Sequence, residues 1–132
     1  MLAIQFHDQF TSSGTLQELI LGVGDDGVGG TGGLWSVVWV NRAAETGLPY
    51  DIECCHPARP AVYVEVKATS TSTKSNFEVS TAELEFACAH NEQYAILRVF
   101  NVGSSWAACH FDLIKQPWSL LQGKGAKLFM QI

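Results

Sequence analysis

The chain has 132 residues, of which 47% are hydrophobic and 16% are charged, and its formal net charge is −5. This size and composition are typical of one compact globular domain and exclude a largely disordered chain. The acidic balance argues against nucleic-acid binding by bulk electrostatics, because phosphate binding normally needs a basic surface.

Targeting and membrane signals are missing from the sequence. No apolar run reaches the roughly 18–20 residues that span a bilayer, and the start, MLAIQFHDQF, lacks the pattern of a signal peptide. We therefore expect a soluble, intracellular protein with no membrane partner. The sequence does not distinguish the nucleus from the cytoplasm.

The N-terminal quarter is predicted to be a variable segment, residues 1–33, ahead of a folded domain over residues 34–132. Apolar residues at helical spacing predict a short helix over residues 15–22. The glycine-rich stretch 22–33 predicts a flexible loop, because glycine loses the most backbone entropy on ordering. The lysine and Ser/Thr of a phosphate-binding P-loop are absent from it.

The next part of the chain predicts three strands. Runs of β-branched and aromatic residues indicate strands over residues 34–41, 50–54 and 62–69. The segment HPARP, residues 56–60, contains two prolines. Because proline cannot donate to a ladder, we expect this segment to break the pairing.

The second half predicts a helix over residues 80–90 and strands over residues 94–102 and 106–114. For the tail, residues 118–132, we expect one helical turn, a GKG turn and a terminal strand KLFMQI. This order of elements predicts an α/β or α+β domain with a mixed central sheet flanked by helices.

The strand VYVEVK suggests a chemical site. Side chains alternate across a strand, so its three valines face the core while Glu65 and Lys67 face the other way. The strand that carries Asp51 can return beside them in a hairpin-like pairing. Two carboxylates suit Mg²⁺, and Lys67 could orient or deprotonate a water or offset phosphate charge during phosphodiester cleavage. On spacing alone, a surface ion pair on a solvated sheet face is the commoner arrangement.

The cysteines do not form a zinc motif. Adjacent residues of a strand point to opposite faces, so Cys54 and Cys55 cannot easily share a metal, and the sequence has no CxxC. We expect reduced thiols and no zinc.

Three segments together carry a family resemblance. WVNRAAETGLPYDIE, VYVEVKATSTSTKSNFEVSTAELEFA and YAILRVFNV resemble the C-terminal domain family of the plant protein NO VEIN, over about residues 34–132. That family is similar to a divergent branch of the PD-(D/E)XK nuclease-like superfamily. The resemblance implies a restriction-endonuclease-like αβββαβ core, with Asp51 as the metal-binding aspartate and Glu65 with Lys67 as the acidic-x-Lys element.

The function that this resemblance implies is a nuclease-like domain that cleaves or binds DNA or RNA with Mg²⁺. The alternative is a catalytically inactive nuclease-fold module that interacts with other domains or proteins. The acidic charge favours the alternative, and so does the absence of the longer first helix with a Gly-Arg-x-Gly-Glu-like motif that relatives usually have. Glu18 is the only candidate to replace the glutamate of that motif.

Other residues could assist the site. Glu45 lies near Asp51 in the sequence and could reach a metal, or it could be a solvent-exposed loop residue. Ser80 and Glu83 have the spacing of a capping box at the start of a helix. Tyr50 and Tyr63 could stack on a base, although aromatic packing beside a sheet is the commoner use of such residues.

Overall fold

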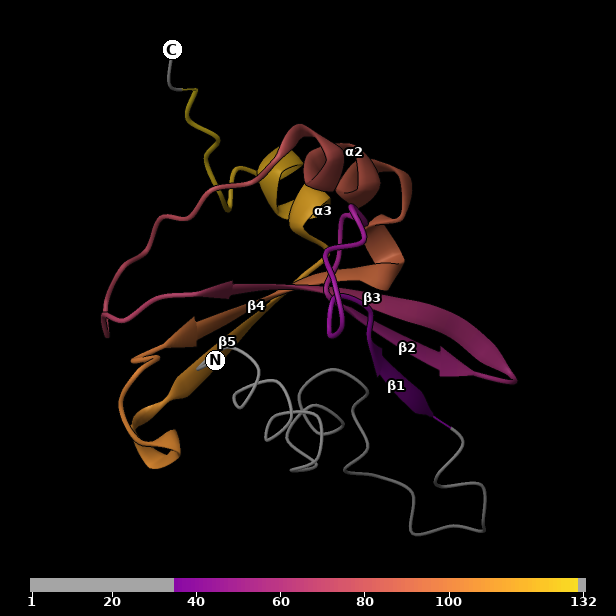
Figure 1. Ribbon diagram of the computed structural model, residues 1–132. Coiled ribbons are helices and arrows are strands. Elements are labelled where there is room, and N and C mark those ends of the chain that lie inside the picture. Colours follow the sequence, from indigo (N-terminus) through magenta and orange to yellow (C-terminus); the bar gives the residue numbers. More distant parts are fainter. Residues whose placement is uncertain (1–34, 131–132) are drawn as a thin grey trace, which may run out of the picture.

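The computed structural model describes residues 35–130 (Figure 1). The predicted helix over residues 15–22 and the glycine-rich loop lie outside this range, and the predicted domain boundary at residue 33 stays a prediction. The elements in chain order are β1 (Ser36–Trp39), β2 (Ile52–His56), β3 (Arg59–Ala68), α2 (Thr81–Ala89), η2 (Asn91–Gln93), β4 (Tyr94–Phe100), η3 (Trp106–Ala108), β5 (His110–Lys115) and α3 (Pro117–Gln122).

The strands form one five-stranded sheet in the order β1-β2-β3-β4-β5. The neighbours are antiparallel except β3 and β4, which are parallel. A parallel pair needs a crossover connection, and residues 69–93, which include α2, provide it. The prediction of an α+β domain with a mixed central sheet is therefore confirmed.

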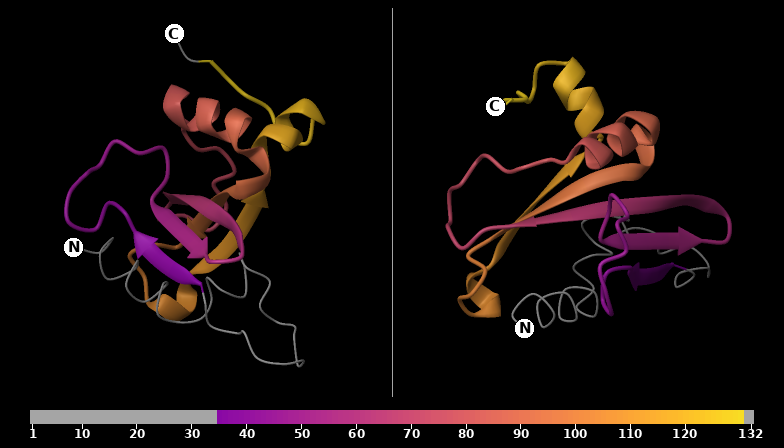
Figure 2. Two further views of the ribbon diagram at one scale, coloured as in Figure 1. Left: turned by 90° about the vertical axis from the view of Figure 1, so that its right-hand side faces the viewer. Right: turned by 45° about the horizontal axis from the view of Figure 1, so that its top comes forward.

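The sheet has a different core on each face. Helices α2 and α3 cover one face (Figures 1 and 2). Val62, Val64 and Val66 pack on the opposite face, as predicted from strand alternation. The fully buried residues of that valine face are Ile52, Cys54, Val64, Leu97 and Val99, and the helix-covered face buries Tyr50, Ala87, Tyr94 and Ile96.

The helix-covered face is also the face that carries Glu65. The residue is only 9% exposed, so the predicted alternative of an ion pair on a solvated face is wrong. Alternation correctly separated Glu65 from the valines. It could not indicate that α2 would cover the polar side as well.

The expectation that HPARP breaks the ladder is partly wrong. Strand β2 continues to His56 and β3 begins at Arg59, so residues 57–58 alone form the turn. Pro60 lies inside β3, opposite a register shift between Cys54 and His56. A proline is tolerated at such an irregularity near the start of a strand, because the ladder is already interrupted there.

The C-terminal part contains less strand than expected. Trp106–Ala108 forms a 3-10 turn, so β5 begins only at His110. The described part of the expected terminal strand, residues 127–130, has no regular structure, and Phe129 and Met130 are highly exposed. The backbone amide of Gly125 donates to the carbonyl of Leu120 and turns the chain back on α3, away from the sheet. Within residues 35–130, no helix is long and apolar enough to cross a membrane.

Candidate functional site: a lysine between two carboxylates

Lys67 lies between two glutamates from different elements. Its Nζ is 3.0 Å from Oε1 of Glu65, which also belongs to β3, and 2.9 Å from both carboxylate oxygens of Glu83 on α2. The three side chains are 11–18% exposed. The packing of α2 on the sheet therefore turns the short E-x-K pattern into a largely buried charge network.

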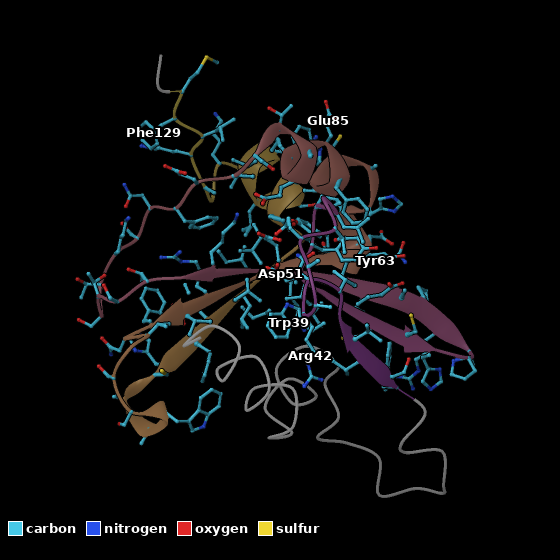
Figure 3. The ribbon with its side chains drawn as sticks, viewed as in Figure 1. Trp39, Arg42, Asp51, Tyr63, Glu85 and Phe129 are labelled. Carbon is cyan, nitrogen blue, oxygen red and sulfur yellow. The ribbon has the colours of Figure 1, made fainter. Side chains whose placement is uncertain are left out.

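Asp51 precedes β2 and is held beside β3, the strand that carries Glu65 and Lys67. Its backbone amide donates to the carbonyl of Val64, which extends the ladder by one residue. Its Oδ2 accepts the backbone N–H of Val66 at 2.9 Å, and its Oδ1 accepts Nδ2 of Asn41 at 3.0 Å. The Asp51 carboxylate is thus bonded to the residue between Glu65 and Lys67, near the centre of the sheet (Figure 3).

Burial and the nearby Asp51 carboxylate change the acidity of Glu65. Burial raises the pKa of Glu65 to about 8, and the Asp51 carboxylate acts in the same direction while Lys67 opposes it. Burial also raises the pKa of Tyr94, with smaller contributions from Glu65, Glu83 and Asp51. The Glu65 carboxyl therefore keeps its proton to a higher pH than an ordinary glutamate, and a bound cation would favour loss of that proton.

The pKa values of Lys67 and Glu83 shift in the directions that are expected of an ion pair. Burial lowers the pKa of Lys67, but its hydrogen bonds to Glu83 and Glu65 outweigh burial and raise the pKa above its ordinary value. Burial raises the pKa of Glu83, but hydrogen bonds from Lys67 and Ser80 outweigh it and leave the pKa lowered. Lys67 therefore acts as a protonated donor, and the predicted option that it deprotonates water does not fit this arrangement.

The predicted capping box at the start of α2 is present. The Ser80 hydroxyl accepts the backbone N–H of Glu83 at 3.2 Å, and the Glu83 carboxylate accepts the backbone N–H of Ser80 at 2.9 Å. The same carboxylate binds Lys67, a second role that spacing did not reveal. The S-x-x-E pattern thus fixes the helix start and the lysine together.

Replacement of Ser80 by alanine is expected to lower the free energy of unfolding by about 1 kcal/mol, because one cap of α2 is lost. Urea denaturation checks this value. Ser75→Ala, in the exposed loop before α2, is the matched control and should have little effect. Equal effects of the two substitutions would contradict a capping role for Ser80.

Asn41 is a site residue that sequence reasoning missed. Its Oδ1 accepts the amide and hydroxyl of Thr46 at 3.0 and 2.6 Å, while its Nδ2 donates to Asp51. The Asn of WVN therefore joins the ETG loop to the aspartate. Glu45 is exposed, and its Oε1 accepts the amide of Gly47 in its own loop. The structure places Glu45 in a loop contact and not on Asp51.

The aromatic residues near the site pack together. The rings of Tyr50 and Tyr63 are 4.7 Å apart, and both contact Phe86 of α2. Tyr50 is buried, and the Tyr94 hydroxyl donates to the carbonyl of Pro49 at 3.0 Å. These contacts match the packing alternative for the two tyrosines and hold the loop that leads to Asp51.

The donor set of the site suits a hard cation. In the part of the chain that the structure describes, no group of three or more His, Cys, Asp or Glu residues is placed to hold a metal. Mg²⁺, however, is commonly held by one or two carboxylates, with waters and substrate oxygens completing its shell. Because each carboxylate oxygen has two lone pairs, Asp51 can keep its hydrogen bonds and still bind a cation. Asp51 and Glu65 therefore fit Mg²⁺.

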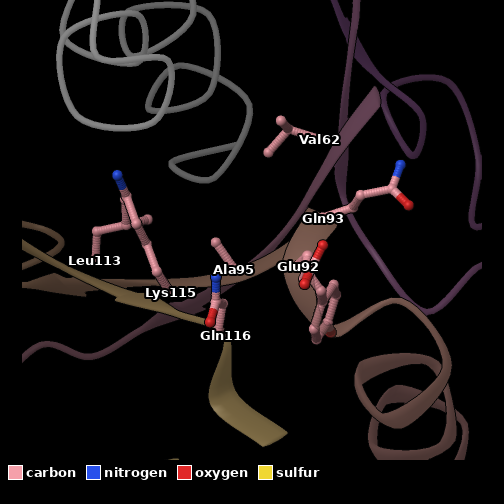
Figure 4. A pocket seen from close by; sticks show the side chains of 8 residues that line it. Val62, Glu92, Gln93, Ala95, Leu113, Lys115 and Gln116 are labelled. Carbon is pink, nitrogen blue, oxygen red and sulfur yellow. The ribbon is translucent and has the colours of Figure 1, made fainter. Parts of the chain in front are cut away.

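Neither the cysteines nor the small pocket adds to this site. Among the described residues all four cysteines are free, and the absence of zinc stays a prediction. A pocket of about 150 Å³ includes Val62, Ala95 and Leu113 in its lining (Figure 4). Val62 and Leu113 belong to the valine face, so the pocket opens away from Glu65 and Lys67.

Comparison with known proteins gives matches to one family. The family described as Protein NO VEIN, C-terminal, matches residues 22–111. Protein NO VEIN-LIKE of Arabidopsis thaliana is 46% identical over 63 residues, which cover 48% of this chain and 10% of that protein. Protein NO VEIN of the same plant is 43% identical over 63 residues, which cover 48% of this chain and 2% of that protein. No solved structure matches.

Proposed function

Because the chain belongs to the NO VEIN C-terminal family, we propose that it is a nuclease-like domain of PD-(D/E)XK type that uses Mg²⁺ to cleave phosphodiester bonds in nucleic acid. The observation that carries this proposal is the grouping of Asp51, Glu65 and Lys67 at one end of the β2–β3 hairpin. The matched part of the plant relatives is a small fraction of their length, so their whole activity is not transferred to this chain.

The order of elements supports the proposal. Three strands, a helix and a further strand follow one another from β1 to β4, as the resemblance implies for the part after the first helix. The aspartate directly precedes β2 and the E-x-K element lies inside β3. A buried carboxylate with a raised pKa beside a second carboxylate is also the kind of perturbed group that functional sites contain.

In the proposed reaction, Asp51 and Glu65 hold the cation and Lys67 orients the reactants. When bound, Mg²⁺ supplies Lewis acidity toward a phosphoryl oxygen and lowers the pKa of a coordinated water. Glu65 would bind the cation as a carboxylate, and Lys67 would keep its contact with Glu83. The ammonium of Lys67 is left to donate to the attacking water or to the charge that builds on the phosphate.

Titration calorimetry with Mg²⁺ and Mn²⁺ tests the cation site. We expect saturable binding to the native chain and its loss in Asp51→Asn, which keeps an oxygen that can accept the Val66 amide. Exposed Asp112→Asn on β5 is the matched control and should bind as the native chain does. Binding that survives in Asp51→Asn would contradict the proposed ligand.

Cleavage assays test the reaction itself. Single-stranded, duplex and branched DNA and RNA are offered with Mg²⁺ and, separately, with EDTA. We expect Mg²⁺-dependent products from the native chain and none from Glu65→Ala or Lys67→Ala. Cleavage that persists in both variants would mean that another site, or a contaminant, is responsible.

The second candidate is a catalytically inactive nuclease-fold module that binds another domain or protein. The observation that favours it is that Lys67 already has the Glu83 carboxylate as its ion-pair partner and also contacts Glu65, so its donors are satisfied without a cation. The net charge of −5 points the same way. A native chain that binds neither Mg²⁺ nor Mn²⁺ and cuts none of the substrates would favour this function.

A further inference from the structure

Arg98 of β4 is a buried cation that the proposed reaction does not use. The residue is 4% exposed and lies in register with Lys67 of β3 and with Asp112 of β5. Burial lowers the pKa of Arg98, and Asp112 partly offsets this effect. Within residues 35–130, the structure gives Arg98 no ion pair with a carboxylate. A buried charge without such a pair is costly, so its other contacts need an explanation.

Those contacts join β3, the strand that carries Glu65 and Lys67, to the loop that leads into α2. One terminal nitrogen of Arg98 donates to the carbonyl of Lys67 at 3.3 Å, and the other donates to the carbonyl of Lys74 at 2.7 Å. Its guanidinium also lies over the ring of Phe77, 4.7 Å from the centroid, and near the ring of Phe100, at 5.1 Å. One planar group thus bridges the end of β3 and the loop of residues 69–77.

The same loop is tied to the turn after β4 by backbone hydrogen bonds. Val102 donates to the carbonyl of Thr69 at 3.0 Å, and Asn101 donates to the carbonyl of Thr71 at 3.1 Å. The loop therefore has two attachments, one through the Arg98 side chain and one through the backbone. Of the two, only the Arg98 attachment contacts the residue that carries the site ammonium.

We propose that Arg98 is a positioning residue for Lys67: it clamps the carbonyls of Lys67 and Lys74 and so fixes the end of β3 against the loop of residues 69–77. A planar guanidinium bonds two carbonyls from separate nitrogens while its face lies on a ring, a geometry that the single nitrogen of an ammonium does not reproduce. The expected effect of Arg98 on catalysis rests on the proposed nuclease function. Its expected effect on the order of Lys67 and of the loop does not depend on that function.

Arg98→Lys is the test variant, with Phe77→Leu as a milder change that removes the ring under the guanidinium. Arg59→Lys, at the exposed start of β3, is the matched control. The first measurement is nuclear magnetic resonance of the Lys67 ammonium and of the amides of Asn101 and Val102. In Arg98→Lys we expect the Lys67 ammonium signal to broaden or disappear and both amides to exchange about 10-fold faster or more. Phe77→Leu should change both in the same direction by less.

The second measurement is kinetic. In Arg98→Lys we expect kcat to fall about 10-fold or more while Mg²⁺ affinity stays unchanged, because Asp51 and Glu65 are not touched. Unchanged Lys67 and amide signals in a folded Arg98→Lys or Phe77→Leu variant would overturn the proposal. A native chain without Mg²⁺ binding or cleavage would refute the nuclease function, and the resonance measurements would still decide the role of Arg98.

Discussion

Replacement of Lys67 by methionine is expected to lower the free energy of unfolding by about 2–4 kcal/mol at pH 7. Methionine has a similar length but leaves the ionised Glu83 carboxylate without its main partner. Removal of one partner from a fully buried ion pair typically costs about 3–5 kcal/mol, and the 18% exposure of Lys67 reduces this amount. Guanidinium denaturation of native and variant chains measures the difference.

A double variant separates charge from packing in this result. Glu83→Gln combined with Lys67→Met removes the orphaned charge, and glutamine can still serve in the capping box. We expect the double variant to recover at least about 1 kcal/mol of the lost free energy, as coupled neighbours do. A double variant that is less stable than Lys67→Met alone would show that the loss comes from packing and not from the unpaired carboxylate.

The stability of the chain in EDTA is expected to fall as the pH rises from about 4.5 to about 8. The pKa of Glu65 is about 8 in the fold, against an ordinary value of 4.5. A group with a raised folded pKa contributes stability that is complete below the unfolded pKa and is lost as the pH passes the folded pKa. Each unit of difference corresponds to about 1.4 kcal/mol, so the loss amounts to a few kcal/mol.

Two variants, each with one glutamate replaced by glutamine, test the origin of this pH dependence. Glu65→Gln should remove most of the slope between pH 4.5 and pH 8, because glutamine does not titrate. Glu85→Gln, on the outer side of α2, should leave the slope unchanged (Figure 3). Glu83 has a lowered pKa, so its contribution is lost only as the pH falls below the ordinary range of a glutamate. A slope that remains in Glu65→Gln would assign the effect to another group.

Much of the sheet could be predicted from the sequence because its signals are local. Alternation in β3 indicated which side chains share a face, and the largely apolar run of β4 indicated a strand. The capping box at Ser80 and Glu83 gave the first turn of α2. Each of these inferences depends on residues within one or two turns or strand repeats of one another.

The parts that could not be predicted depend on tertiary contacts. The burial of Glu65 follows from α2 lying over β3, and no residue in VYVEVK indicates that helix. The bond from Asn41 to Asp51 joins two motifs across a loop, and the bond from Arg98 to Lys67 joins two strands that are neighbours only in space. The expected strand at KLFMQI was wrong over its described residues, because the Gly125 hydrogen bond to Leu120 turns the chain back on α3.

The parallel pairing of β3 with β4 also implies an order of events during folding. The β2–β3 hairpin closes through a two-residue turn, whereas β3 reaches β4 only across residues 69–93. Closing the longer segment costs more chain entropy and is the slower step. Glu65 and Lys67, which both belong to β3, are therefore expected to be exposed to solvent when the hairpin first forms. Helix α2 packs later, adds Glu83 and excludes the solvent. Refolding kinetics of Lys67→Met would show this as faster unfolding with little change in the folding rate.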